Sequence, residues 1–272
     1  MSSVPGVAEL MRAVGYRRNL PIDDPESLVD VELPVPRPRP HDLLVRVEAV
    51  SVNPVDVKVR ASSDPRGDVK VLGYDAAGVV EAVGDRVTLF AVGDEVYYAG
   101  SIARPGTNSQ LHLVDERITG PKPASLSFAE AAALPLTTIT AWEALFDRLR
   151  LTPESTGTLL VLGAAGGVGS ILVQLARRLT GLTVVGTASR PESRDWVTGL
   201  GANHVVNHHD DLAKAVSAIA PDGVDAVFSP HSAGMIETFA KLVRPYGDIV
   251  AIDEPDGLDL LPLKTKSIAW HW

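Results

Sequence analysis

The chain has 272 residues, of which 45% are hydrophobic and 22% charged, a composition that suits a soluble globular protein with a sizeable core. Its formal net charge of −9 argues against nucleic acid or an anionic membrane as the main partner. The absence of cysteine excludes disulfides, thiolate catalysis and cysteine-ligated zinc. No apolar run reaches transmembrane length and no signal-peptide pattern opens the chain, so we expect a cytoplasmic protein.

The first part of the chain, up to about residue 130, is rich in strand patterns. Residues 28–33, 43–51, 79–83 and 95–98 have the alternating or apolar character of strands. Gly-Asp pairs between these segments mark turns, and helical periodicity is scarce.

From about residue 134 the pattern changes to helices and strands in alternation. This alternation predicts an α/β fold with a doubly wound parallel sheet and a ligand site at the carboxyl ends of its strands. We therefore place one domain at 1–133 and a second at 134–272. The expected strands are 158–162, 182–188, 204–207, 224–229 and 248–252, and the expected helices are 139–149, 168–179, 192–200, 210–219 and 235–243.

A small-residue loop between the strand at 158–162 and the next helix is typical of dinucleotide binding. Ala164, Gly166 and Gly169 fill the three positions of the glycine fingerprint, and backbone N–H groups there would approach a pyrophosphate. An ordinary strand–turn–helix built from small residues is the alternative. The residues expected to bind the cofactor here are Ala164, Ala165, Gly166, Gly167 and Val168.

The end of the strand at 182–188 favours NADPH over NADH. NAD enzymes usually place Asp or Glu there, against the ribose 2′-hydroxyl. Here Ser189 and Arg190 follow instead, and both can donate hydrogen bonds to a 2′-phosphate that a carboxylate would repel. Arg194, one helical turn later, adds a second cation. A solvated surface role for Arg190 is the alternative.

Motifs along nearly the whole chain resemble the medium-chain dehydrogenase/reductase superfamily, in its quinone oxidoreductase branch and most closely its zinc-type alcohol dehydrogenase-like proteins. The resemblance implies a GroES-like β-rich domain followed by a Rossmann domain, with a small-molecule substrate and a possible homodimer. It also implies a returning segment that completes the first domain, and we expect this chain to lack it. The motifs lie at 51–56, 73–80, 84–87, 93–96, 136–142 and 164–169.

The zinc ligands of the family's alcohol dehydrogenases are not matched in this chain. Those enzymes use a cysteine and the histidine of a Gly-His-Glu motif, whereas this chain lacks cysteine and has Tyr74 at the histidine position. His204, His208 and His209 cluster at or near a strand, where adjacent side chains point to opposite faces. We predict that no metal is bound.

The resemblance implies a set of site residues, each with a structural alternative. Asn53 would face the nicotinamide and substrate, or stabilise a turn before Pro54. Lys58 would donate to the acceptor oxygen, or be solvated. Tyr74 and Tyr98 would line the substrate cleft, or pack in the core. Further cofactor contacts are implied for Thr140 and His208.

The predicted activity is therefore zinc-independent transfer of hydride from NADPH to a quinone or an α,β-unsaturated carbonyl compound. An acceptor of this kind needs no metal to stabilise an alkoxide. Two alternatives stay open: an NADPH-binding sensor or partner-binding protein with little activity, and a zinc-dependent alcohol dehydrogenase with ligands other than cysteine.

Overall fold

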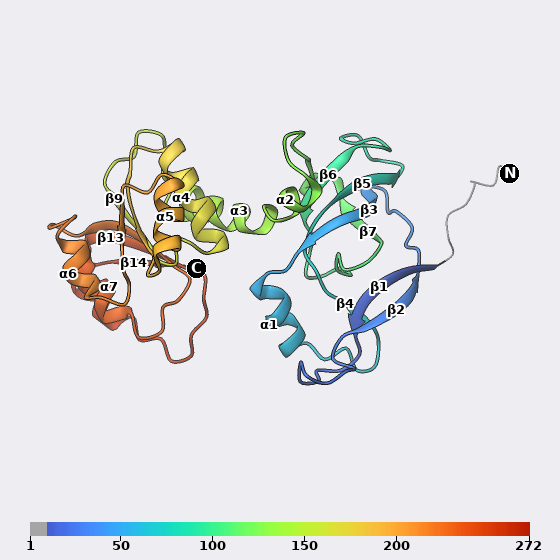
Figure 1. Ribbon diagram of the computed structural model, residues 1–272, viewed down its shortest axis with the longest axis horizontal. Coiled ribbons are helices and arrows are strands. Elements are labelled where there is room, and N and C mark those ends of the chain that lie inside the picture. Colours follow the sequence, from blue (N-terminus) through green and yellow to red (C-terminus); the bar gives the residue numbers. More distant parts are fainter. Residues whose placement is uncertain (1–9) are drawn as a thin grey trace. The chain divides into compact units, whose positions relative to one another are not determined.

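The computed structural model describes residues 10–272 and divides into two compact units, the first ending at Leu136 and the second beginning at Thr137 (Figure 1). No helix within residues 10–272 is long and apolar enough to cross a membrane.

The first unit is built on two antiparallel sheets. The larger has the strand order β7-β3-β5-β6-β8, and the smaller has the order β2-β1-β4. The strands are β1 (Leu10–Tyr16), β2 (Val29–Pro34), β3 (Asp42–Ser51), β4 (Lys70–Val71), β5 (Asp75–Val83), β6 (Glu95–Ala99), β7 (Leu111–Asp115) and β8 (Gly120–Pro121). Their inward side chains form a core that includes Leu43, Val45, Ala76, Val80, Val96, Tyr98 and Val114.

Two short α-helices of the first unit were not predicted from the sequence, because neither has a long apolar stripe. In α1 (Pro54–Ser62) a proline occupies the first turn, and Asp56 accepts a hydrogen bond from the Asn53 N–H that precedes the helix. In α2 (Phe128–Ala132) Ser127 and Glu130 form a capping box. Local capping, rather than periodicity, therefore specifies both helices.

The second unit is a six-stranded parallel sheet with the order β11-β10-β9-β12-β13-β14, which confirms the predicted α/β fold class. The strands are β9 (Thr158–Val161), β10 (Thr183–Thr187), β11 (His204–Val206), β12 (Val224–Ser229), β13 (Val243–Ala251) and β14 (Ala269–His271). The helices are α3 (Pro135–Trp142), α4 (Gly167–Leu179), α5 (Pro191–Gly199), α6 (Leu212–Ser217) and α7 (Ile236–Leu242). Short helical turns lie at Glu116–Ile118 and Leu261–Lys266.

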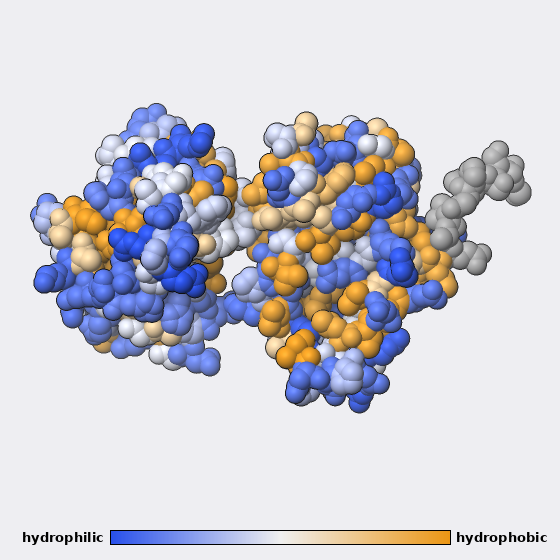
Figure 2. Space-filling model, viewed as in Figure 1, coloured by the Kyte–Doolittle hydropathy of each residue, from blue (hydrophilic) through white to orange (hydrophobic). Residues whose placement is uncertain are grey.

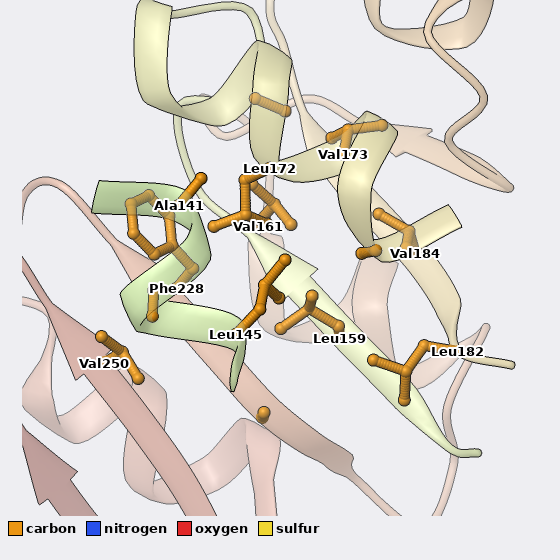
Figure 3. Packing of buried hydrophobic residues seen from close by; sticks show 14 of the residues in the cluster. Ala141, Leu145, Leu159, Val161, Leu172, Val173, Leu182, Val184, Phe228 and Val250 are labelled. Carbon is orange, nitrogen blue, oxygen red and sulfur yellow. The ribbon is translucent and has the colours of Figure 1, made fainter. Parts of the chain in front are cut away.

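Helices cover both faces of this sheet, because side chains along each strand alternate between two cores. Leu159 and Val161 of β9 pack with α4 on one face, where Figure 3 shows Val161 close to Leu172. Leu160, between them, packs with α6 and α7 on the other face. Strands buried on both faces read as continuous apolar runs, which is why the sequence predicted them well.

One predicted helix differs in its bounds. The expected helix at 139–149 begins earlier, at Pro135, and its α-helical part ends at Trp142. A wider π-helical turn, Glu143–Arg148, continues it. This turn brings the rings of Trp142 and Phe146 within 4.5 Å of each other, centroid to centroid.

Candidate functional site

The loop after β9 makes a sharp turn that depends on Gly163. Gly163 has φ of 61°, its N–H donates to Thr187 Oγ1 at 3.0 Å, and its carbonyl accepts from Gly166 at 2.9 Å. The left-handed residue of the turn is thus Gly163, directly before Ala164 at the first fingerprint position. Ala164 is instead fully buried, and its N–H donates to the Thr187 carbonyl at 3.2 Å.

The helix that follows starts unusually close to this turn. A Cβ at Gly169 would lie 2.3 Å from the Gly163 oxygen and 2.7 Å from Ala164 Cα, so only glycine fits. Gly166 caps α4 without a side-chain hydrogen bond, and both Gly166 and Gly167 are exposed. The first N–H groups of α4 therefore have no side-chain acceptor, and with the helix dipole they form a site for an anion such as a pyrophosphate.

The residues after β10 present cations to solvent. Ser189 is half-buried, Arg190 is exposed at the N-cap of α5, and neither Arg190 nor Arg194 has an ion-pair partner within residues 10–272. One Arg194 nitrogen lies 3.4 Å from the Val205 carbonyl. This arrangement leaves both guanidinium groups available to a phosphate.

A cavity of about 570 Å³ opens at the carboxyl ends of β9, β10 and β12. His208, one of the predicted cofactor residues, lines it, with its ring 4.4 Å from that of His209. Partial burial and the neighbouring His209 lower the pKa of His208. The cavity lining consists of Leu162, Gly163, Thr187, His208, Asp210, Asp211, Leu212, Ala213, Pro230, His231, Met235, Thr238 and Lys241.

In the first unit, a buried polar pair forms around Asn53. Asn53 is 5% exposed and Asp75 is fully buried. The Asn53 side-chain amide donates to Asp75 Oδ2 at 2.8 Å, and the Leu136 N–H donates to Asp75 Oδ1 at 2.8 Å. Burial raises the pKa of Asp75 to about 6, although both hydrogen bonds favour its charged form.

Asp75 was not predicted as a site residue, although the sequence contains a signal for it. The segment 75–80 is otherwise made of Ala, Gly and Val, so a carboxylate at its start enters a buried strand. It also lies directly after Tyr74, where the resemblance placed a ligand motif. A buried charge needs dedicated donors, and Asn53 is one of them.

Asp56 has a structural role at the start of α1. Its two oxygens accept from the backbone N–H groups of Asn53 at 2.8 Å and Gly73 at 3.0 Å. It thereby connects the start of α1 to the loop before β5.

Tyr98, which the resemblance would place in a substrate cleft, takes the structural alternative of packing in a core. Tyr98 is 2% exposed within the core of the larger sheet, and its hydroxyl is 3.0 Å from Nδ1 of His112. The two rings stack with centroids 5.5 Å apart, and burial raises the pKa of Tyr98 and lowers that of His112 to about 4. Tyr98 is therefore a core residue.

The other predicted residues lie in different settings. Tyr74 is 4% exposed, and burial with the nearby Asp56 raises its pKa. Lys58 is exposed on α1 and has no ion-pair partner among the described residues. Thr140 is half-buried within α3. Their roles toward a substrate or cofactor stay predictions.

The donor atoms around Asn53 do not suit zinc. Both oxygens of Asp75 and both oxygens of Asp56 already accept hydrogen bonds, and zinc in proteins prefers sulfur and imidazole ligands. Across residues 10–272, no three His, Asp or Glu side chains gather in a way that could hold a metal ion.

Two family models match this chain. Residues 39–142 match the alcohol dehydrogenase GroES-like domain, and residues 167–268 match the zinc-binding dehydrogenase domain. The first match covers the whole of the larger sheet of the first unit, and the second starts at the first residue of α4.

Three similar proteins span most of the chain. A zinc-type alcohol dehydrogenase-like protein of Staphylococcus epidermidis is 38% identical over 96% of this chain and 79% of its own length. A crystal structure from Rhizobium etli CFN 42, provisionally assigned as a zinc-dependent alcohol dehydrogenase, is 54% identical over 96% of this chain and 78% of its own, with a TM-score of 0.91. The structure of the quinone oxidoreductase of Escherichia coli in complex with NADPH is 26% identical over 95% of this chain and 79% of its own, with a TM-score of 0.80.

Proposed function

The chain belongs to the medium-chain dehydrogenase/reductase superfamily of oxidoreductases, and on that premise we propose that it uses NADPH to reduce a quinone or an α,β-unsaturated carbonyl compound without a metal. The observation that carries this proposal is the Asn53–Asp75 pair. Both carboxylate oxygens of Asp75 already accept hydrogen bonds, from the Asn53 amide and the Leu136 N–H, so this carboxylate is not available as a zinc ligand. An acceptor with an electron-poor double bond needs no metal to take up hydride.

The residues of the second unit fit NADPH. The uncapped first turn of α4 would hold the pyrophosphate, with Gly166, Gly167 and Val168 offering backbone N–H groups. Ser189 and Arg190 would hold the 2′-phosphate, and Arg194 and His208 would add positive charge and a ring nearby. The similarity to an oxidoreductase that binds NADPH supports this assignment.

NADPH, when bound, supplies the hydride, and the protein must position the acceptor and stabilise charge on its oxygen. Asn53 has a fixed orientation because Asp75 accepts from its amide nitrogen. The remaining N–H of that amide is then oriented to donate to an acceptor oxygen. Lys58, on the exposed side of α1, would supply the proton that follows the hydride.

A test of this proposal measures NADPH oxidation against a panel of quinones and enones, with NADH run in parallel. We expect turnover with at least one electron-poor acceptor, faster with NADPH than with NADH, and unchanged by a chelator. The Asn53→Ala variant serves as the matched loss-of-function control.

Two outcomes would replace the proposal with a different function. Tight NADPH binding without turnover on any acceptor would indicate a sensor or partner-binding protein. Alcohol oxidation that depends on added zinc and disappears with chelator would indicate a metal-dependent alcohol dehydrogenase.

A further inference from the structure

A cluster of two buried hydroxyl groups and one half-buried carboxylate joins the carboxyl ends of β12 and β13. Asp253 follows β13 and accepts two hydrogen bonds from Ser232, from its N–H at 2.5 Å and from its hydroxyl at 2.7 Å. Ser232 is fully buried and Asp253 is half-buried, so the contact lies partly inside the protein. Hydrogen bonds to a carboxylate are among the stronger ones in proteins.

Ser229 extends the cluster into the loop between β12 and α7. It is the last residue of β12, is fully buried, and donates from its hydroxyl to the His231 carbonyl at 2.9 Å. Its oxygen also lies 3.2 Å from Ser232 Oγ. The side chains of Ser229 and Ser232, on either side of Pro230 and His231, therefore hold this segment in place.

This segment contacts the glycine turn of the candidate cofactor site. A Cβ built on Gly163 would lie 3.1 Å from Pro230 Cγ, so the proline ring lies directly against the turn. Pro230 and His231 also line the cavity of about 570 Å³. A shift of the segment would therefore change both the cavity and its contact with Gly163.

A second carboxylate, at the amino end of β12, serves as a comparison because it lies away from the cavity. Asp225, at the start of β12, accepts from the Thr158 N–H at 2.6 Å and from Arg244 Nε at 2.6 Å. Neither carboxylate lines the cavity, but the partner of Asp253, Ser232, directly follows the lining residues Pro230 and His231. The partners of Asp225, Thr158 and Arg244, are not among the lining residues. Asp225 therefore only links strands, whereas Asp253 also holds the segment that forms one wall of the cavity.

We propose that Asp253 is a positioning residue for NADPH binding, acting through Ser232 to hold Pro230 and His231 against the glycine turn. This inference rests on the proposed function, since it assumes that the cavity beside the turn receives part of NADPH. It assigns Asp253 no contact with the cofactor. Its effect comes from the pre-organised wall, whose displacement by even a small distance weakens binding.

The test compares NADPH titrations of the wild-type protein with Asp253→Ala, Asp253→Asn, Ser232→Ala and Asp225→Ala, together with the melting temperature of each. We expect Asp253→Ala to raise the dissociation constant for NADPH roughly tenfold, through loss of both hydrogen bonds to Ser232. Asp253→Asn keeps a carbonyl oxygen that can accept from Ser232 and should restore part of the affinity. Asp225→Ala should lower the melting temperature while leaving the dissociation constant unchanged.

The failures of the two proposals are distinguishable. If the wild-type protein binds no NADPH, the proposed function fails and this inference fails with it. If the wild-type protein binds NADPH and Asp253→Ala binds it equally well, or no more weakly than Asp225→Ala, only the positioning role is overturned. If Asp253→Ala does not fold, Asp253→Asn and Ser232→Ala decide by the same comparison.

Discussion

The two candidate regions of this protein are held in place by different kinds of interaction. In the second unit, the turn after β9 is shaped mainly by backbone: Gly163 adopts a left-handed conformation, and Gly169 lets α4 start against it. In the first unit, Asn53 and Asp75 are placed by side-chain hydrogen bonds within a buried setting. Steric fit therefore decides the effect of a substitution in the turn, whereas hydrogen bonding and charge decide it around Asn53.

The surfaces of the two units differ as well. Figure 2 shows hydrophobic residues gathered over parts of the first unit on the face that is drawn, while the second unit shows mainly hydrophilic residues there. Val50, Val52 and Val57, close in sequence to Asn53, are among the exposed hydrophobic side chains of the first unit. Under the proposed function, these exposed side chains would favour an apolar acceptor over a charged one.

The largest effect is expected in the turn, from Gly169→Ala. The added methyl group would meet backbone atoms at 2.3 and 2.7 Å, which cannot move as a side chain can. We expect a loss of about 3 kcal/mol in the free energy of unfolding, measured with urea, together with loss of NADPH binding. Gly199→Ala is the control, because no atom lies within 4 Å of its added methyl group. Equal stability of the two variants would show that α4 is not confined by the turn.

Asn53→Ala should separate catalysis from cofactor binding. We expect turnover to fall about a hundredfold, as when one oriented donor to a developing oxyanion is removed, while the dissociation constant for NADPH changes little. Asn19→Ala is the matched control, since Asn19 is an exposed asparagine of the same unit that donates to the Ala61 carbonyl at 3.0 Å. Unchanged turnover in Asn53→Ala would remove Asn53 from the site.

Arg190→Ala should alter the choice of cofactor. We expect the Michaelis constant for NADPH to rise about tenfold, equivalent to about 1.4 kcal/mol, with little change for NADH. Arg178→Ala, which removes an exposed arginine of α4, should change neither constant. Equal effects of Arg190→Ala on both cofactors would refute contact with the 2′-phosphate.

The second unit was more predictable from sequence than the first, for a physical reason. Parallel strands buried on both faces give apolar runs that can be located without knowing their partners, so β12 was predicted at its observed bounds. In the first unit, β4 and β8 are two residues long and exist through their pairing with β1 and β6. Tertiary pairing of this kind leaves no local pattern.

The candidate site was predicted in part. The sequence located the turn after β9 but not its left-handed residue, because Gly163 lies one position before the start of the fingerprint at Ala164. It identified Asn53 but missed Asp75, whose burial becomes apparent only once β5 is placed inside the sheet. For Tyr98 the resemblance implied a cleft position with core packing as the alternative, and strand alternation alone does not reveal which face of a strand is the core. The predicted homodimer stays a prediction.

The raised pKa of Asp75 gives the subtlest test of the comparison. In the folded protein the pKa is about 6, against 3.8 for an ordinary aspartate, so the folded state holds this proton more tightly than the unfolded chain. The contribution of Asp75 to stability is therefore full below about pH 4 and is lost as the pH rises through about 6. Asp75→Asn removes this titration, and the Asn53 amide can rotate to donate or accept as needed. As the pH rises from about 4 to about 6, the wild-type protein should lose about 1 to 3 kcal/mol of its free energy of unfolding, a loss that Asp75→Asn should not show. Urea titration of both proteins at each pH measures this difference.

Asp115→Asn is the control for this measurement because the pKa of Asp115 is shifted in the opposite direction. The hydrogen bonds from Arg117 lower it below the ordinary value of 3.8, so the contribution of Asp115 changes only in more acidic solution. Its stability curve should run parallel to that of wild type from pH 4 to pH 6, a range set by the two Asp75 values. If Asp75→Asn also runs parallel to wild type there, Asp75 is ionised at all these pH values. The contrast would then weaken, because the first unit would hold Asn53 through a permanent charge rather than through a carboxyl poised to take up a proton.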